Sequence, residues 1–459
     1  MGKNITNHAG LTSFFPKSSL WTVLRGFLLV CWLAISLISI NHIYPFFVFF
    51  SHLSGQLLGW LGWFTAVLAV VVYGRGHLVE ITSLAVSFFL LGTLLGSFLE
   101  PPADPLEHLR RIHECSCGKT VEDIPRSNRG LWQYSMAGTV LCVRDREKIV
   151  PAAMLHRINI VNGMFWALGS SVLFILGMKA GLPVRWSLFS VLTCFLFFGT
   201  NRFSYFRYYS LAPTFTSLCI YWFWIALFFF RKKARDIVSG LVIALSALPV
   251  IWVNHNQEAV FLFFVIMLWL SILCIEWRTI PVPVGLLKSK PSSLSGLFSV
   301  RFLFCCSLFL TLWLLPQSTS FLHWLSRFFS RGQWPHYQSL YVQWHGLYIG
   351  GKIAGFRIMD TLGNISIASL VLAIPYFHFK CFNRRAGMRA RLFILAILPF
   401  IVYFTPFLHF VWSSNVRAAE YYRFCYATAF WLFFSHFLFG IEEGICTAFA
   451  GASILHKRD

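Results

Sequence analysis

About twelve apolar runs, each close to the length that a lipid bilayer requires of a helix, follow one another along this chain. A helix rises 1.5 Å per residue, so about 20 apolar residues cross a hydrocarbon core of about 30 Å. Only 12% of the residues are charged, whereas soluble domains carry about a quarter. We therefore predict an all-α polytopic membrane protein of about 12 transmembrane helices, forming one integral membrane domain over residues 1–459. The runs are residues 22–41, 56–73, 80–99, 158–178, 187–200, 214–230, 237–253, 259–276, 300–316, 363–379, 391–411 and 424–440.

The basic residues lie between the apolar runs, and with about twelve spans their richest connectors fall on one side of the membrane. The positive-inside rule assigns that side, and with it both chain termini, to the cytoplasm. The formal net charge of +21 suits anionic membrane lipid or a phosphorylated ligand. Because the basic residues are spread between apolar runs, we expect no nucleic-acid partner. The basic connectors are residues 231–235, 278–301, 380–391 and 456–458, on the same side as Lys3, Lys17 and Arg25.

The opposite, extracytoplasmic face receives most of the unusual polar residues. Its two largest segments are the loops of residues 100–157 and 317–362. We expect the first loop to carry the catalytic motif and two amphipathic helices at the membrane surface. The second loop is rich in aromatic residues, which suit sugar rings and bilayer interfaces alike. Convergence of polar groups on one face predicts a functional site there. The smaller segments are residues 201–213, 254–258 and 412–423.

The first loop opens with the strongly ionic stretch Glu100-Pro-Pro-Ala-Asp104-Pro-Leu-Glu107-His108-Leu-Arg-Arg111. On a helix, its last four numbered side chains share one face, because they are spaced i, i+3, i+4 and i+7. Asp104 and Glu107 fit a capping box, with a proline at the first helical position. Alternatively, Asp104 is a general base that takes the proton of an acceptor hydroxyl. The two interpretations are compatible, since a cap fixes the side chain.

Residues 104–112 follow the pattern Asp-x-x-x-His-x-x-Arg-Ile, which resembles the first large external loop of membrane glycosyltransferases with the C-type fold (GT-C). These enzymes include oligosaccharyltransferases and lipid-linked-sugar transferases. The resemblance implies transfer of a sugar from a polyprenyl phosphate or diphosphate to a glycan, lipid or protein acceptor, with inversion of the sugar carbon. It implies Asp104 as the base, Glu107 and His108 beside it, and Arg111 near the lipid phosphate.

Such an enzyme would serve polysaccharide biosynthesis in the cell envelope, from a bacterial inner (plasma) membrane with an extracytoplasmic active site. Here three predicted spans precede the loop, whereas many family members have one.

The connector of residues 201–209 offers a first set of phosphate ligands, Arg202, Arg207 and Tyr208. Arginine suits a lipid phosphate because its planar fork makes bidentate hydrogen bonds. The alternative is an interfacial aromatic belt with snorkelling arginines.

The stretch of residues 415–423 offers a second set, Arg417 and Arg423. The resemblance implies that an external arginine before a late helix neutralises the leaving phosphate. The alternative is helical pairing with Glu420, which lies three residues from each.

The short connector of residues 254–258 holds His255 and Glu258. An ionisable pair at a membrane boundary is unfavourable unless it is satisfied, so it predicts a functional site. His255 can donate to the departing phosphate, and Glu258 can orient it or bind a sugar hydroxyl. The alternative is a helix-end cap with a solvated carboxylate.

No metal site is assigned, since no zinc-type cysteine spacing is present. A divalent cation, Mg or Mn, held by Glu100, Asp104 and Glu258 is an alternative means of stabilising the leaving phosphate.

Two other functions compete with single sugar transfer. A polysaccharide polymerase or ligase would use the same lipid-linked substrates. A lipid or solute transporter would need broken helices and charges near mid-membrane, but the span centres carry almost no charge.

Overall fold

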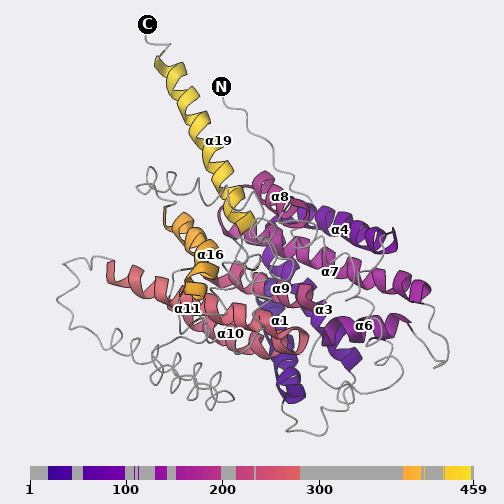
Figure 1. Cartoon of the computed structure of the whole chain (residues 1–459). Helices are drawn as coiled ribbons and strands as arrows, with labels where there is room; N and C mark the ends of the chain where they lie inside the picture. The colour runs from indigo at the N-terminus through magenta and orange to yellow at the C-terminus, as the bar shows by residue number, and fades with distance from the viewer. Residues whose placement is uncertain are drawn as a thin grey trace, which may run out of the picture.

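The computed structural model of the chain describes residues 19–43, 55–98, 108, 112, 130–141, 151–197, 213–231, 234–279, 386–404, 408, 427 and 430–455 (Figure 1). All regular structure in these ranges is helical, which confirms the all-α expectation for this part of the chain. The α-helices are α1 (Ser19–Ile43), α3 (Gly55–Gly74), α4 (Leu78–Phe98), α6 (Leu131–Leu141), α7 (Pro151–Lys179), α8 (Val184–Leu192), α9 (Pro213–Trp224), α10 (Ala234–Asn254), α11 (Asn256–Thr279), α16 (Ala386–Phe404) and α19 (Phe430–Leu455). Tighter or wider helical turns are η1 (Arg75–His77), η3 (Thr193–Phe197) and η5 (Ile225–Phe229).

Five segments of the described chain are long and apolar enough to cross a membrane, which supports the predicted membrane protein. They are Leu20–Asn41, Leu58–Leu95, Arg157–Lys179, Ile237–Asn254 and Asn256–Leu273. The apolar runs 300–316 and 363–379 lie outside the described residues, so the count of about twelve spans stays a prediction.

Successive helices run in alternating directions along α7. α3 runs in the same direction as α7, since Trp63 donates to the carbonyl of Met164 and, further along, Gly74 lies against Ile175. The short turn η1 then reverses the chain, and α4 packs along α7 in the opposite direction. Because of this alternation, every second segment that connects two helices lies on the same side of the bundle.

One side of the bundle, which we call the Arg391 end, gathers basic residues. The guanidinium carbon of Arg75 lies 5.4 Å from the ring centroid of Trp21, so the end of α3 meets the start of α1. Lys179, at the end of α7, is electrostatically coupled to Arg75 and to Arg231, just beyond η5. The starts or ends of several helices far apart in sequence therefore share this side.

Arg391 itself is a buried helix cap. It lies in α16 with 2% of its surface exposed, and its Nη1 donates to the carbonyl oxygens of Phe229 (2.6 Å) and Arg231 (3.3 Å). Carbonyls at a helix C-terminus lack intrahelical partners, and a guanidinium supplies both donors and positive charge. The sequence suggested that Arg391 belongs to a solvated basic connector. The structure differs because folding brings α16 onto the end of η5.

The helices α7, α9 and α11 form the centre of the bundle. In the apolar segments of α7 and α11, 83% and 78% of the residues are buried, against 17% in α1. Indole rings hold this centre together: Trp222 meets Trp431 at 5.5 Å and Trp224 meets Trp269 at 5.4 Å, both edge to face. The aromatic residues of these helices are therefore core residues.

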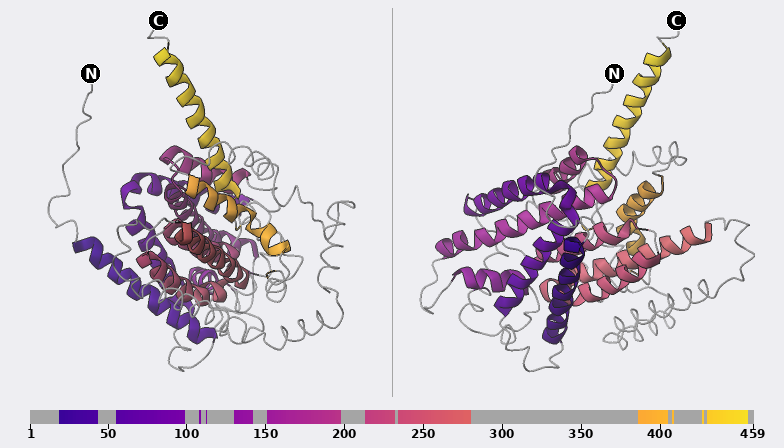
Figure 2. Two further views of the ribbon diagram at one scale, coloured as in Figure 1. Left: turned by 90° about the vertical axis from the view of Figure 1, so that its left-hand side faces the viewer. Right: turned by 180° about the vertical axis from the view of Figure 1, so that it is seen from behind.

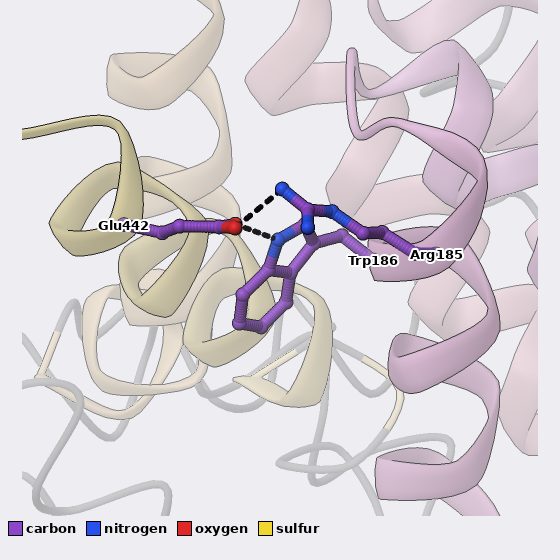
Figure 3. A network of polar contacts seen from close by, with 3 residues as sticks. All are labelled: Arg185, Trp186 and Glu442. Carbon is purple, nitrogen blue, oxygen red and sulfur yellow. Dashed lines mark hydrogen bonds and ion pairs between the residues drawn. The ribbon is translucent and has the colours of Figure 1, made fainter. Parts of the chain in front are cut away.

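Helix α19 extends past the other helices at the Arg391 end (Figure 2). Where it leaves the bundle, the carboxylate of Glu442 accepts hydrogen bonds from the Arg185 guanidinium and from Trp186 Nε1 of α8 (Figure 3). Six residues earlier in α19, His436 Nε2 lies 2.6 Å from the carbonyl oxygen of Ala180. These contacts fix α19 against the turn between α7 and α8.

The described helix of the first large loop, α6, lies inside the bundle. Residues 132–138 are all buried, and α6 contacts α3, α7, α9 and α10. An amphipathic helix at a membrane surface would keep one polar face exposed. α6 therefore differs from the interfacial helices that we expected in residues 100–157, and the rest of that loop, like residues 317–362, lies outside the described residues except for 108, 112 and 151–157.

The close packing of α4 on α7 can be tested at Gly163. A Cβ at this position would lie 2.6 Å from the backbone carbonyl oxygen of Phe89, which cannot move without shifting α4. We expect Gly163→Leu to lower the free energy of unfolding by about 1–3 kcal/mol, seen as a lower Tm of the purified protein in detergent. The control is Gly26→Leu on α1, where an added Cβ meets nothing within 4 Å. Equal Tm values for both variants would contradict this packing.

Candidate functional site

The start of α6 is capped by Asn254, the last residue of α10. The backbone N–H of Gly130 donates to the Asn254 carbonyl oxygen (2.5 Å), and the N–H of Trp132 donates to its Oδ1 (3.0 Å). The first amides of a helix have no intrahelical acceptor, so a distant part of the chain satisfies the amide of Trp132 and, just before the helix, that of Gly130. Gly130 has φ +79°, a conformation that favours glycine. We call this side of the molecule the His255 end.

His255 and Glu258 form a buried pair directly after the cap. His255 Nδ1 lies 2.5 Å from Glu258 Oε2, and the two side chains are 6% and 0% exposed. The backbone N–H of His255 still donates to Ile251, so the junction between α10 and α11 is tight. With Nδ1 directed at the carboxylate, the second ring nitrogen, Nε2, is the atom that can meet a substrate.

Several buried polar atoms in the two segments that meet at this cap lack a hydrogen-bond partner in the part of the chain that the structure describes. They are Oε1 of Glu258, Oδ1 of Asn256, and both Oε1 and Nε2 of Gln133, whose residue is 0% exposed. Unsatisfied buried polar groups are rare and are typical of places where ordered water or a polar ligand binds. We call the set Gln133, Asn254, His255, Asn256 and Glu258 the polar cluster. All five lie within four residues of the hydrogen bonds that join α6 to Asn254.

A residue of the motif at positions 104–112 also contacts α6. His108 Nδ1 is hydrogen-bonded to the hydroxyl of Tyr134 in the first turn of α6, and their rings lie 5.7 Å apart. Ile112, which ends the motif, is buried in the core with 1% of its surface exposed. α6 therefore connects His108 with the capped junction that carries His255 and Glu258.

Most of the other predicted site residues lie outside the described residues. These are Glu100, Asp104, Glu107, Arg111, Arg202, Arg207, Tyr208, Arg417 and Arg423. Among the predicted residues, the structure pairs His255 with Glu258 and places His108 against Tyr134 of α6, and the placement of the rest stays a prediction.

Gln133 and Tyr134 were missed by sequence reasoning. The signal was a single glutamine and a tyrosine in the otherwise apolar stretch Leu-Trp-Gln-Tyr-Ser-Met of α6. A lone polar side chain in an apolar helix of a membrane protein indicates an interior position or a site.

The described residues hold no group of three or more His, Cys, Asp or Glu side chains that could bind a metal ion. Of the carboxylates considered for a Mg or Mn ion, only Glu258 lies in the described part of the chain. A metal-assisted mechanism therefore stays an open alternative.

Comparison of the chain with protein-family models, with curated proteins and with solved structures gave no match. The functional argument therefore depends on the residues of the site alone.

The cap of α6 can be tested with Asn254→Ala. This substitution removes the side-chain acceptor of the buried Trp132 amide, and we expect a loss of about 1–3 kcal/mol in stability. Hydrogen exchange should show faster exchange for the first amides of α6. Ser271→Ala serves as the control, because Ser271 is exposed on α11 and only bonds back to Met267. Unchanged exchange in α6 would contradict the role of Asn254.

Proposed function

We propose that this protein is an inverting glycosyltransferase that moves a sugar from a polyprenyl-phosphate or polyprenyl-diphosphate donor to an extracytoplasmic acceptor. The observation that carries the proposal is the buried His255–Glu258 pair, 2.5 Å apart, in which Glu258 Oε1 has no partner among the described residues. It lies at the same end of the bundle as His108, which belongs to the loop motif that begins at Asp104.

The reaction requires two proton-linked events. The acceptor hydroxyl must lose a proton as it attacks the sugar carbon, and the leaving phosphate must be stabilised as negative charge grows on it. Asp104 or Glu107 would accept the proton from the hydroxyl. The bond between the sugar carbon and the phosphate oxygen breaks as the new glycosidic bond forms, so the sugar carbon inverts.

His255 is suited to the leaving phosphate. The carboxylate of Glu258 orients the imidazole through Nδ1, and an imidazolium at this position would donate from Nε2 to a phosphate oxygen. Gln133 would supply an amide donor to a sugar hydroxyl or to the phosphate. Arginines at positions 202, 207, 417 and 423 would add positive charge, and a Mg or Mn ion is the alternative source of that charge.

The distribution of charge supports an extracytoplasmic site. Arg25, Arg75, Lys179 and Arg231 belong to the Arg391 end, which the positive-inside rule assigns to the cytoplasm. The polar cluster at the opposite end would then face the periplasm or cell exterior. Polyprenyl-linked sugars presented on that face of a bacterial inner membrane would be the donors.

A transporter is the second candidate, because a buried histidine–carboxylate pair in a membrane bundle is also a typical proton-relay site. Polymerisation of lipid-linked glycans is a variant of the first proposal, and the length of the products distinguishes it from single transfer.

The direct test is transfer of labelled sugar from polyprenyl-phosphate donors by purified protein in lipid. We expect Asp104→Asn to abolish transfer, and His255→Gln or Glu258→Gln to lower kcat by about 10²-fold or more, as is typical of general acid–base groups. The two glutamine variants should keep the Tm within a few degrees, since glutamine is close in size to the side chain it replaces and can still form hydrogen bonds.

The chain contains a matched control. His77 and Glu80 have the same i, i+3 spacing at the Arg391 end, but they are 3.8 Å apart and about one third exposed. His77→Gln and Glu80→Gln should leave transfer unchanged. Equal transfer by all four glutamine variants would contradict a role for His255 and Glu258, and proton-driven solute flux without sugar transfer would favour the transporter.

A further inference from the structure

A second site lies away from the polar cluster, in an apolar cavity between α1, α3, α7, α9 and α10. The cavity measures about 890 Å³ when the space at its open side is included. Its walls are almost entirely apolar or aromatic, with side chains such as Ala69, Phe223 and Ala247. A cavity of this kind fits a hydrocarbon chain.

The cavity is elongated along the bundle. Its lining on α9 and η5 extends from Thr216 to Phe228, which corresponds to about 18 Å at 1.5 Å per residue. One leaflet of a bilayer contributes about 15 Å to the hydrocarbon core. Trp132 of α6 and Thr216 line the inner part of the cavity, at the level of the first turn of α9. The cavity therefore matches a chain that belongs to one leaflet.

The mouth of the cavity carries positive charge. Arg25 of α1 lines the cavity at the Arg391 end and is exposed, and no acidic side chain pairs with it among the residues that the structure describes. One turn earlier on α1, Trp21 lies under Arg75, which brings a second guanidinium to this region. An anionic head group would therefore be attracted here, whereas a neutral one would not.

The outer wall, α1, is a peripheral helix that packs mainly on its neighbours α3 and α10 (Figure 1). Trp32 Nε1 donates to Ser246 Oγ (2.8 Å) and so holds the middle of α1 to α10. Val23, Phe27 and Val30 on its other face are 57–66% exposed, as expected of side chains in contact with lipid. Only α1 therefore separates this side of the cavity from the membrane lipid.

We propose that this cavity holds an acyl chain of an anionic glycerophospholipid from the leaflet at the Arg391 end, with the lipid phosphate bound by Arg25. The proposed phosphate ligand, Arg25, lies at the end of the bundle opposite to the polar cluster, although the inner wall of the cavity reaches Trp132 of α6. It does not depend on the proposed sugar transfer. The lipid would fill the gap between α1 and the core, and so stabilise the bundle by adding apolar contacts that the helices alone do not make.

The test uses phosphatidylglycerol that carries a diazirine at the end of one acyl chain, incorporated with the full chain into phosphatidylcholine nanodiscs. After irradiation, cross-linked peptides are mapped by mass spectrometry. We expect labelling at the inner part of the cavity, on α9 near Thr216 and on α3 near Thr65. Phosphatidylcholine with the same photoreactive chain should label these peptides about tenfold less, because Arg25 and Arg75 repel the choline cation that lies beside its phosphate.

Two variants and one control separate the contributions. Arg25→Gln should lower labelling by the anionic probe to the level of the phosphatidylcholine probe, and this exposed residue is not needed for folding. Ala69→Phe should fill the cavity and abolish labelling by either probe, and size-exclusion and Tm measurements report whether it folds. Arg185→Gln changes an exposed arginine of α8 outside the cavity and should change nothing.

Labelling confined to the outer face of α1, equal for both probes and insensitive to Arg25→Gln, would overturn the proposal and leave only annular lipid. Labelling of the cavity by a photoreactive polyprenyl phosphate, but not by phosphatidylglycerol, would show that another lipid occupies it and would also overturn the proposal.

Discussion

A bilayer offers no water to backbone N–H and C=O groups, so helix ends inside a membrane protein must find partners within the chain. Two such contacts organise the described bundle. Asn254 caps the start of α6 with its carbonyl and side-chain oxygens, and Arg391 caps the end of η5 with its guanidinium. Each joins segments more than a hundred residues apart in the sequence. The position of α6, and with it the candidate site, depends on the first of these contacts.

The candidate site follows from that cap. Because Asn254 is held by α6, the next residues begin α11 in a fixed orientation, and His255 meets Glu258 one turn later. A buried carboxylate is unfavourable unless it is paired and hydrogen-bonded, and here one of its oxygens remains without a partner among the described residues. Proteins retain such an arrangement where a ligand or a proton completes it. The polar cluster thus offers hydrogen-bonding groups to a ligand, whereas the cavity offers apolar contacts.

The sequence predicted the parts of this structure that depend on local patterns. The apolar runs that lie in the described residues became helices, and the polar connector 254–258 became the junction that carries His255 and Glu258. The sequence did not predict the surroundings of residues that are contacted by distant parts of the chain. Gln133 lies in an apolar helix that looks unremarkable until Asn254 is placed against it, and Arg391 looks like a solvated loop residue until α16 meets η5. The cavity could not be predicted at all, because its walls come from six α-helices and from η5.

The central claim is that the polar cluster binds the phosphate of a lipid-linked sugar. It is tested most directly by an experimental structure of the protein with a non-transferable analogue of a polyprenyl-phosphate sugar. The account predicts a phosphate oxygen within about 3 Å of His255 Nε2, with the sugar near Gln133. A phosphate bound at the Arg391 end, with the polar cluster untouched, would contradict it.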